Sequence, residues 1–105
     1  MILDHRTYTL FPQALPEFYK LYEAEGYPVQ SKILGNLFGF FHTEFGPLNQ
    51  IVHMWAYDSF EERTRRRTEL FQNAQWLAYI TRVRPLISHM ENKLLMPAPF
   101  FKLPK

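Results

Sequence analysis

Four stretches of the chain are rich in apolar, aromatic and β-branched residues with a two-residue alternation, which predicts four β-strands. Gly46 and Pro47 predict a tight turn between the second and third stretches, so we expect these two strands to form an antiparallel hairpin. The four predicted strands are Ile2 to Phe11, Gly35 to Phe45, Asn49 to Tyr57 and Leu86 to Met96.

A helical repeat of apolar residues lies between the first two predicted strands. The stripe has the spacing i, i+3, i+4, i+7 and predicts a helix from about Ala14 to Glu25. Gly26 predicts its end and Pro28 prevents its continuation. We therefore expect residues 27–34 to be a connection, in which a short helical turn is allowed. The stripe consists of Leu15, Phe18, Tyr19 and Tyr22.

A second helix follows the third strand. Asp58 with Glu61, and Ser59 with Glu62, both have the spacing of a capping box, so either Asp58 or Ser59 is expected to begin the helix. This helix is predicted to reach about Phe71.

Asn73 can cap a further helical segment, from Ala74 to Val83, which Pro85 ends. One face of this segment is apolar and predicts packing against the sheet. That face carries Trp76, Tyr79, Ile80 and Val83.

The resulting order of elements is β-α-β-β-α-β, which is the ferredoxin-like arrangement. We expect an α+β fold in which helices cover one face of a four-stranded antiparallel sheet. Residues 1–96 form a single domain in this interpretation, and residues 97–105 form a proline-rich tail. Both sheet faces carry apolar side chains, and an uncovered apolar face would make a lone domain insoluble. The sequence therefore predicts a two-fold homodimer that packs sheet on sheet.

Composition and charge limit the class of protein. The chain has 105 residues and a formal net charge of +2, which is too weak to indicate a nucleic-acid partner. It contains no cysteine, so disulfides, Fe–S clusters and thiolate zinc sites are excluded. No window approaches the ~18 apolar residues of a membrane span, and the start of the chain lacks a signal-peptide pattern. The expected location is the cytoplasm.

Four arginines, Arg63, Arg65, Arg66 and Arg67, crowd the helix that follows the third strand. Such a run can bind phosphate or an acidic partner. A ring of charge around a helix is more often a solvated face, here with Glu62 pairing to Arg65 or Arg66, and we expect this second case.

The histidines occur one per predicted strand and have no short ligand spacing, so we expect no metal site and no cofactor. They are His5, His42, His53 and His89. The sequence also lacks a glycine-rich phosphate loop, a nucleophile elbow and a pair of catalytic carboxylates.

The third strand carries the candidate site. Strand alternation places Asn49, Ile51, His53, Trp55 and Tyr57 on one face. The ferredoxin-like topology makes the first and third strands neighbours, so Arg6 and Tyr8 can share that face. The candidate ligand-binding residues are Arg6, Tyr8, Asn49, His53, Trp55 and Tyr57.

This group suits a small aromatic or acidic molecule. His53 is the candidate catalytic residue, because imidazole can act as acid or base near neutral pH. Arg6 can pair with a carboxylate or phosphate, the two phenols can donate hydrogen bonds, and Trp55 offers a stacking surface. The same side chains can instead form a structural network that satisfies only its own members. A cavity lined by Arg6, Tyr8, His53 and Trp55 would favour the ligand, and a solid interior would contradict it.

Three blocks of the sequence resemble the NIPSNAP family: Arg6 to Leu10, Leu34 to Phe41, and Gly46 to Asp58. The resemblance extends to about Met96. It implies a dimeric α/β-barrel of the ferredoxin-like type. Shorter matches are Glu62-Arg63, Val83-Arg84-Pro85 and Glu91 to Leu95.

The family resemblance also implies what the chain could do. The superfamily holds cofactor-independent monooxygenases of the antibiotic-biosynthesis kind and several haem-handling proteins, which by analogy would make His53 or His89 candidate haem ligands. NIPSNAP proteins have no agreed reaction, and whether this chain is an enzyme stays open. We expect a homodimer that binds a small molecule and could act on an aromatic or acyl substrate. The alternative is a non-catalytic interaction or scaffold dimer whose aromatic patch is core.

Overall fold

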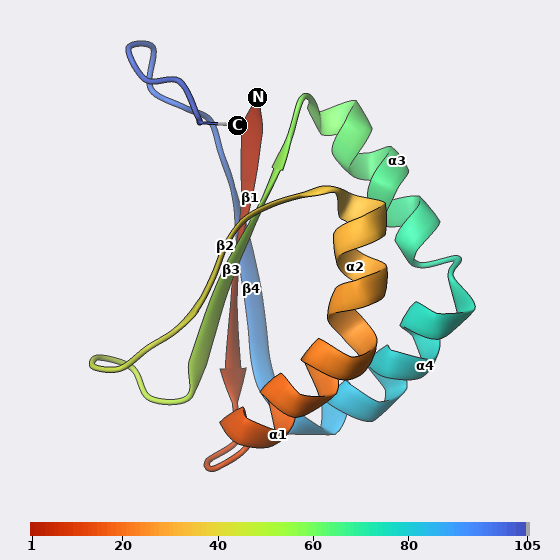
Figure 1. The fold of residues 1–105 in the computed structure, drawn as a ribbon. Coiled ribbons are helices and arrows are strands. Elements are labelled where there is room, and N and C mark those ends of the chain that lie inside the picture. The colour runs from red at the N-terminus through yellow and green to blue at the C-terminus, as the bar shows by residue number, and fades with distance from the viewer. Residues whose placement is uncertain (105) are drawn as a thin grey trace.

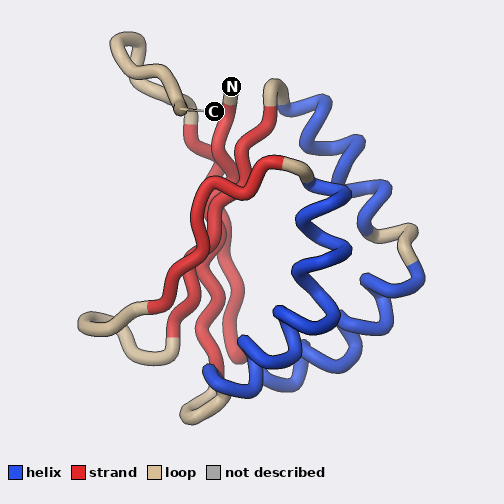
Figure 2. The backbone as a smooth tube through the Cα atoms, viewed as in Figure 1, coloured by secondary structure: helices blue, strands red, loops and turns tan. Residues whose placement is uncertain are grey.

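The computed structural model describes residues 1–104 and arranges them in two layers, a sheet and a set of helices that cover one of its faces (Figures 1 and 2). This is the predicted α+β ferredoxin-like arrangement. The second strand stops at His42 rather than at Phe45. The elements are β1 (Ile2–Leu10), α1 (Leu15–Leu21), the π-helical turn η1 (Tyr22–Gly26), α2 (Tyr27–Leu34), β2 (Asn36–His42), β3 (Gln50–Tyr57), α3 (Phe60–Leu70), α4 (Ala74–Val83), the 3₁₀ turn η2 (Arg84–Leu86) and β4 (Ile87–Leu95).

The sheet is antiparallel with the strand order β2-β3-β1-β4, so β1 and β3 are the central neighbours that the topology predicts. Arg6 lies directly opposite His53 on β3 and opposite Asn92 on β4. Tyr8 lies opposite Met90 on β4. Because directly paired residues share a sheet face, the register gathers these side chains on the face that the helices cover.

The first helical layer does not end at Gly26, and the prediction of a connection over residues 27–34 is wrong. The helix continues from α1 through η1 into α2. A Cβ atom at Gly26 would lie 2.7 Å from ring atoms of Tyr22 and Tyr79, so glycine is needed for close packing rather than as a stop. The wider π turn also accommodates Pro28, which has no N–H to donate to the preceding turn.

Local signals placed the starts of α3 and α4 correctly. The Ser59 hydroxyl accepts the backbone N–H of Glu62 at 3.1 Å and begins α3. The Asn73 side chain accepts the N–H of Trp76 at 2.9 Å and begins α4. Gly35, with a φ of 91°, ends α2. The alternative cap at residue 58 is therefore not used.

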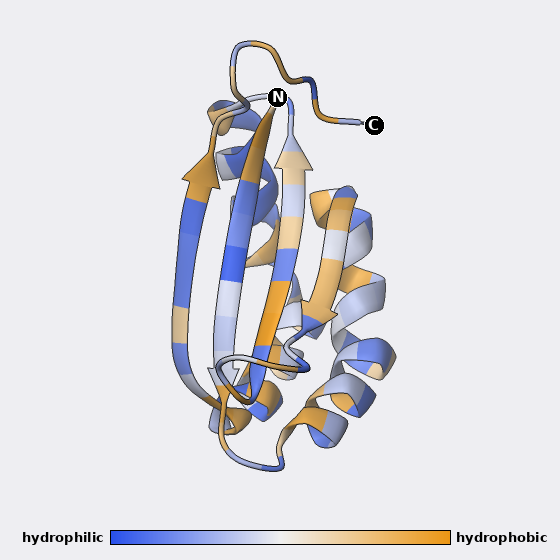
Figure 3. Cartoon of the chain, turned by 90° about the vertical axis from the view of Figure 1, so that its left-hand side faces the viewer, coloured by the Kyte–Doolittle hydropathy of each residue, from blue (hydrophilic) through white to orange (hydrophobic). Residues whose placement is uncertain are grey.

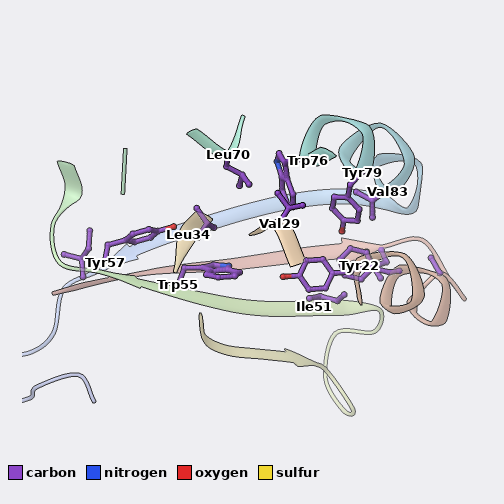
Figure 4. Close-up of a cluster of buried hydrophobic side chains, with 14 residues drawn as sticks. Tyr22, Val29, Leu34, Ile51, Trp55, Tyr57, Leu70, Trp76, Tyr79 and Val83 are labelled. Carbon is purple, nitrogen blue, oxygen red and sulfur yellow. The ribbon is translucent and has the colours of Figure 1, made fainter. Parts of the chain in front are cut away.

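The hydrophobic core fills the space between the two layers, as the close-up in Figure 4 shows. The predicted apolar face of α4 packs there. Its buried side chains include Ile51, Trp55 and Tyr57 on β3, Leu70 on α3, and Trp76 and Tyr79 on α4.

The other sheet face has no helix over it, and Figure 3 views the molecule from this side. Val52 and Met54 on β3 lie on it, next to Phe41 on β2, a residue that is 56% exposed. The half formed by β1 and β4 is more polar and includes Glu91 and Lys93. The apolar part of this face is thus concentrated on β2 and β3.

Beyond β4 the chain forms no regular element up to residue 104 and turns away from the sheet (Figure 1). One turn is closed by the N–H of Phe101, which donates to the carbonyl of Ala98 at 2.9 Å. The last residue of the predicted tail, residue 105, lies outside the described residues. Over residues 1–104, every helix is too short or too polar to cross a bilayer.

Candidate functional site

A cavity of about 70 Å³ lies between the sheet and the helices. Phe71, Arg84 and Met90 are its exposed lining residues and mark the side where it meets solvent. Its volume is about half of the ~150 Å³ that holds a benzene molecule in a protein interior. The remaining lining residues are Arg6, Tyr8, Phe18, Tyr22, Gln30, Phe40, His53, Arg67, Trp76, Tyr79, Ile80, Val83 and Ile87.

The structure brings three of the six predicted ligand-binding residues to this cavity, namely Arg6, Tyr8 and His53. Trp55 and Tyr57 are buried in the adjoining core and do not line it (Figure 4). Asn49 lies in the turn before β3, where its backbone has a φ of 62° and its carbonyl accepts a hydrogen bond from the end of β1. The strand alternation is therefore as predicted, but only the middle of the strand pair reaches the cavity.

His53 is held by Trp55, whose indole N–H donates to Nδ1 of the imidazole at 2.9 Å. An indole N–H can only donate, so Nδ1 is the acceptor and the hydrogen of the neutral ring is assigned to Nε2. Burial lowers the pKa of His53 to about 3, and the guanidinium of Arg6 lowers it as well. Near neutral pH the ring is uncharged.

The Nε2–H group of His53 is buried without a hydrogen-bond partner among the described residues. The ring is stacked on Phe40 at a centroid distance of 5.0 Å and meets Tyr8 edge-on at 4.8 Å. The Nε2–H donor is therefore the one polar group of the imidazole that remains available to a ligand. Acid–base catalysis by His53 stays a prediction, with the constraint that its lone pair is already engaged by Trp55.

A buried carboxylate, Asp4, lies beside the cavity and was not predicted as part of the site. Nε of Arg63 donates to it at 2.9 Å, and the guanidinium of Arg6 donates at 3.3 Å. Burial opposes ionisation of Asp4, but the two guanidiniums outweigh it and hold the pKa of this carboxyl below its usual value. Arg6 also donates from Nε to the Tyr8 hydroxyl at 3.2 Å. Asp4 thus orients Arg6 within the site.

The prediction that the arginine run is a solvated face is wrong for two of its members. The side chain of Arg63 is only 17% exposed and pairs with Asp4. Arg67 lines the cavity, with its guanidinium 5.4 Å from the centre of the Phe71 ring. Their spacing with the buried Leu70, at i, i+4 and i+7, was the signal that they face the sheet.

Arg67 is the least compensated of these charges. It forms no ion pair with any residue from 1 to 104. Burial lowers its pKa, and so do the like charges of Arg6 and Arg63. The preceding residue, Arg66, pairs with Glu62 at 3.1 Å, which is one of the two predicted pairs.

The site does not fit a haem. The cavity at His53 is far smaller than a porphyrin, and the engaged Nδ1 leaves Nε2 protonated. The side chain of His89 is 66% exposed on the edge strand and lies 3.6 Å from Glu91. In the described part of the chain, no three histidine or acidic side chains are grouped to hold a metal ion.

This geometry defines a class of protein, the ferredoxin-like domains that keep a small pocket between the sheet and its helices. The NIPSNAP family model matches residues 3–102, and the chain belongs to the NIPSNAP family. It is 42% identical over 59 residues to the NipSnap homolog of Dictyostelium discoideum, covering 56% of this chain and 26% of that protein. It is 29% identical over 104 residues to human NipSnap homolog 3A, covering 97% of this chain and 41% of that protein. The chain thus spans less than half the length of either relative.

Solved structures agree with the family assignment. A NIPSNAP family protein from Agrobacterium tumefaciens has 41% sequence identity and a TM-score of 0.94, with 98% of each chain covered. A NIPSNAP-like domain protein from Burkholderia xenovorans has 41% identity and a TM-score of 0.92, covering 97% of this chain and 89% of that one. A putative antibiotic biosynthesis monooxygenase from Nitrosomonas europaea, at 10% identity, has a TM-score of 0.68 over 92% of this chain and 98% of that one. This last likeness is one of fold alone.

Proposed function

We propose that this NIPSNAP-family chain is a homodimer that binds a small aromatic or acidic molecule in the cavity between sheet and helices. Arg6, Tyr8 and His53 contact the ligand in this proposal. The observation that carries it is the Nε2–H of His53, which is buried at the cavity and has no hydrogen-bond partner among residues 1–104. A buried donor without an acceptor costs about 1–3 kcal/mol, so a ligand that accepts this hydrogen bond gains binding free energy there.

The enzymatic form of the proposal is a cofactor-independent, monooxygenase-like reaction. Its support is the distant fold likeness, together with a preset N–H donor and a guanidinium that can stabilise negative charge developing on a substrate oxygen. The alternative is a non-catalytic scaffold dimer, in which the aromatic residues around His53 serve only as core.

Ligand screening by thermal shift tests the binding proposal. Wild type, His53→Ala and the control His89→Ala are screened against small carboxylic acids and small aromatic molecules. His89 is a suitable control because its side chain is 66% exposed on the edge strand. We expect ligands that raise the melting temperature of wild type and of the control but not of His53→Ala, since only binding to the native state raises it. Equal shifts in all three proteins would remove His53 from the site, and an absence of shifts throughout would favour the scaffold.

The dimer in this proposal uses the apolar part of the uncovered sheet face, around Phe41, Val52 and Met54. Sedimentation at micromolar concentration is expected to give the mass of two chains for wild type. Met54→Glu places a charge in that contact and is expected to yield monomers. Lys32→Glu, on α2 in the helical layer, is the control and is expected to remain dimeric. A monomeric wild type would contradict this part of the proposal.

A further inference from the structure

Hydrogen-bond donors dominate the polar lining of the cavity. The indole N–H of Trp76 lines it and, like the Nε2–H of His53, is buried without a partner among the described residues. None of the described lining side chains is a carboxylate. The amide oxygen of Gln30 is already taken by the hydroxyl of Tyr22, at 2.6 Å. A ligand that enters therefore meets N–H groups and few free acceptors.

Positive charge is also in excess around this space. Arg6 and Arg63 share the single carboxylate of Asp4. Arg67 has no ion-pair partner within residues 1–104 and lines the cavity directly. The Tyr8 hydroxyl accepts from Arg6 and keeps its own hydrogen for donation. An anion at Arg67 would relieve repulsion among the three guanidiniums.

We propose that the ligand of this cavity is a small aliphatic carboxylate. Its negative charge lies at Arg67, and its oxygens accept hydrogen bonds from His53 and Trp76. This inference rests on the proposed binding function and narrows its ligand class from aromatic or acidic to small and acidic. The preference for a small ligand follows from the cavity volume of about 70 Å³, which is about half of the ~150 Å³ in which a protein interior holds benzene.

Neutral molecules of the same size are poorer ligands, because the cavity offers mainly donors and positive charge. A carboxamide has as many non-hydrogen atoms as the matching carboxylate, but its NH₂ group cannot accept from His53 or Trp76 and finds acceptors only in hydroxyl oxygens such as those of Tyr22 and Tyr79. A water molecule has the same difficulty with its two hydrogens. A carboxylate has acceptors only, and it alone of the three supplies the missing negative charge.

The test compares acetate with acetamide, and propionate with propionamide, on the full chain at constant pH and ionic strength. The reporter is the indole N–H resonance of Trp76 in ¹H–¹⁵N spectra, because hydrogen bonding to a ligand shifts it. Shifts are referenced to an added standard, and the Trp55 indole, which donates to His53, gives a second, indirect readout of binding at the imidazole. We expect saturable shifts with acetate at a dissociation constant of about 1 mM, and at least ~10-fold weaker binding of acetamide, since so small a ligand has few contacts to offer.

Variants on α3 separate a specific role of Arg67 from general attraction of anions. Arg67→Gln is expected to abolish the preference for acetate, and Arg67→Lys to retain part of it. Arg65→Gln removes the same charge from an exposed position on the same helix and is expected to bind like wild type. Circular dichroism of each variant establishes that it is folded.

Three results would contradict the inference. If acetamide binds as tightly as acetate, the ligand class is wrong although the cavity still binds small molecules. If folded Arg67→Gln keeps the full preference for acetate, the charge is recognised elsewhere. If no probe shifts the Trp76 resonance, the inference fails, and the proposed function is then decided separately by the thermal-shift screen, which also contains aromatic molecules.

Discussion

Acid is expected to destabilise this protein through His53. Burial, with a further contribution from Arg6, lowers the pKa of His53 from 6.5 to about 3. The unfolded chain regains the ordinary pKa, so between these two values it binds a proton that the native state excludes. Stability is therefore fully present above about pH 6.5 and falls as the pH is lowered towards 3.

The size of the effect follows from the shift. One pKa unit corresponds to about 1.4 kcal/mol, so the free energy of unfolding should drop by about 2 kcal/mol between pH 7 and pH 5. Asp4 acts in the same direction, because its pKa is held below 3.8, but its contribution is lost only as the pH falls below that value. Above about pH 4.5, the pH dependence of stability therefore reports on His53 rather than on Asp4.

Urea unfolding followed by tryptophan fluorescence, at constant protein concentration, measures this dependence. His53→Asn removes the titrating group and keeps an oxygen near Nδ1 to accept the hydrogen bond from Trp55. We expect this variant to be less stable at pH 7 but nearly insensitive to pH over the same window. His89→Asn changes an exposed histidine and is expected to keep the wild-type slope.

Parallel plots of unfolding free energy against pH for wild type and His53→Asn would refute the reasoning. If wild type and His53→Asn lose stability equally between pH 7 and pH 5, the buried imidazole is not the group that binds the proton. A wild-type protein whose stability does not change over that window would contradict the depressed pKa itself.

Three substitutions test the packing and capping, all by urea unfolding at neutral pH. Asp4→Asn is expected to lower the free energy of unfolding by about 3–5 kcal/mol, because Arg63 and Arg6 lose their buried counter-charge. A loss below ~1 kcal/mol would contradict a buried ion pair. Gly26→Ala is expected to cost about 1–3 kcal/mol, since the added methyl meets two buried tyrosine rings, and a neutral effect would show that the rings can move. Ser59→Ala is expected to cost about 1 kcal/mol through loss of the helix cap, whereas Asp58→Ala, the matched control beside it, should change little. Equal losses in the last pair would mean that both residues cap the helix.

The sequence was sufficient for the strands and for the shared face of Arg6, Tyr8 and His53. Side chains in a strand alternate with a period of two, so a correct assignment of β1 and β3 as neighbours determines which residues lie together. The helix caps were equally accessible, because a cap depends on residues three positions apart. Both kinds of information are local or follow from topology.

Tertiary structure decided the points on which sequence reasoning was wrong. An arginine on a helix can extend into solvent or bury its stem and pair inward, and Arg63 pairs inward because Asp4, 59 positions away, lies across from it. Gly26 has the sequence signature of a helix stop, but the rings packed on it, one of them on a different helix, require the absence of a side chain there. Neither choice can be made from spacing along the chain.

The cavity likewise depends on three-dimensional packing. Alternation along β3 places Trp55 and Tyr57 on the same face as His53, and only the helices that pack above them decide which side chains fill space and which border it. The sequence by itself determined the fold, the sheet face and the presence of His53 on it. Only the tertiary structure decided the state of this histidine. The hydrogen bond from Trp55 makes Nε2 the donor atom, burial keeps the ring neutral, and Arg67 adds positive charge to the cavity, because each of these effects depends on neighbours in space.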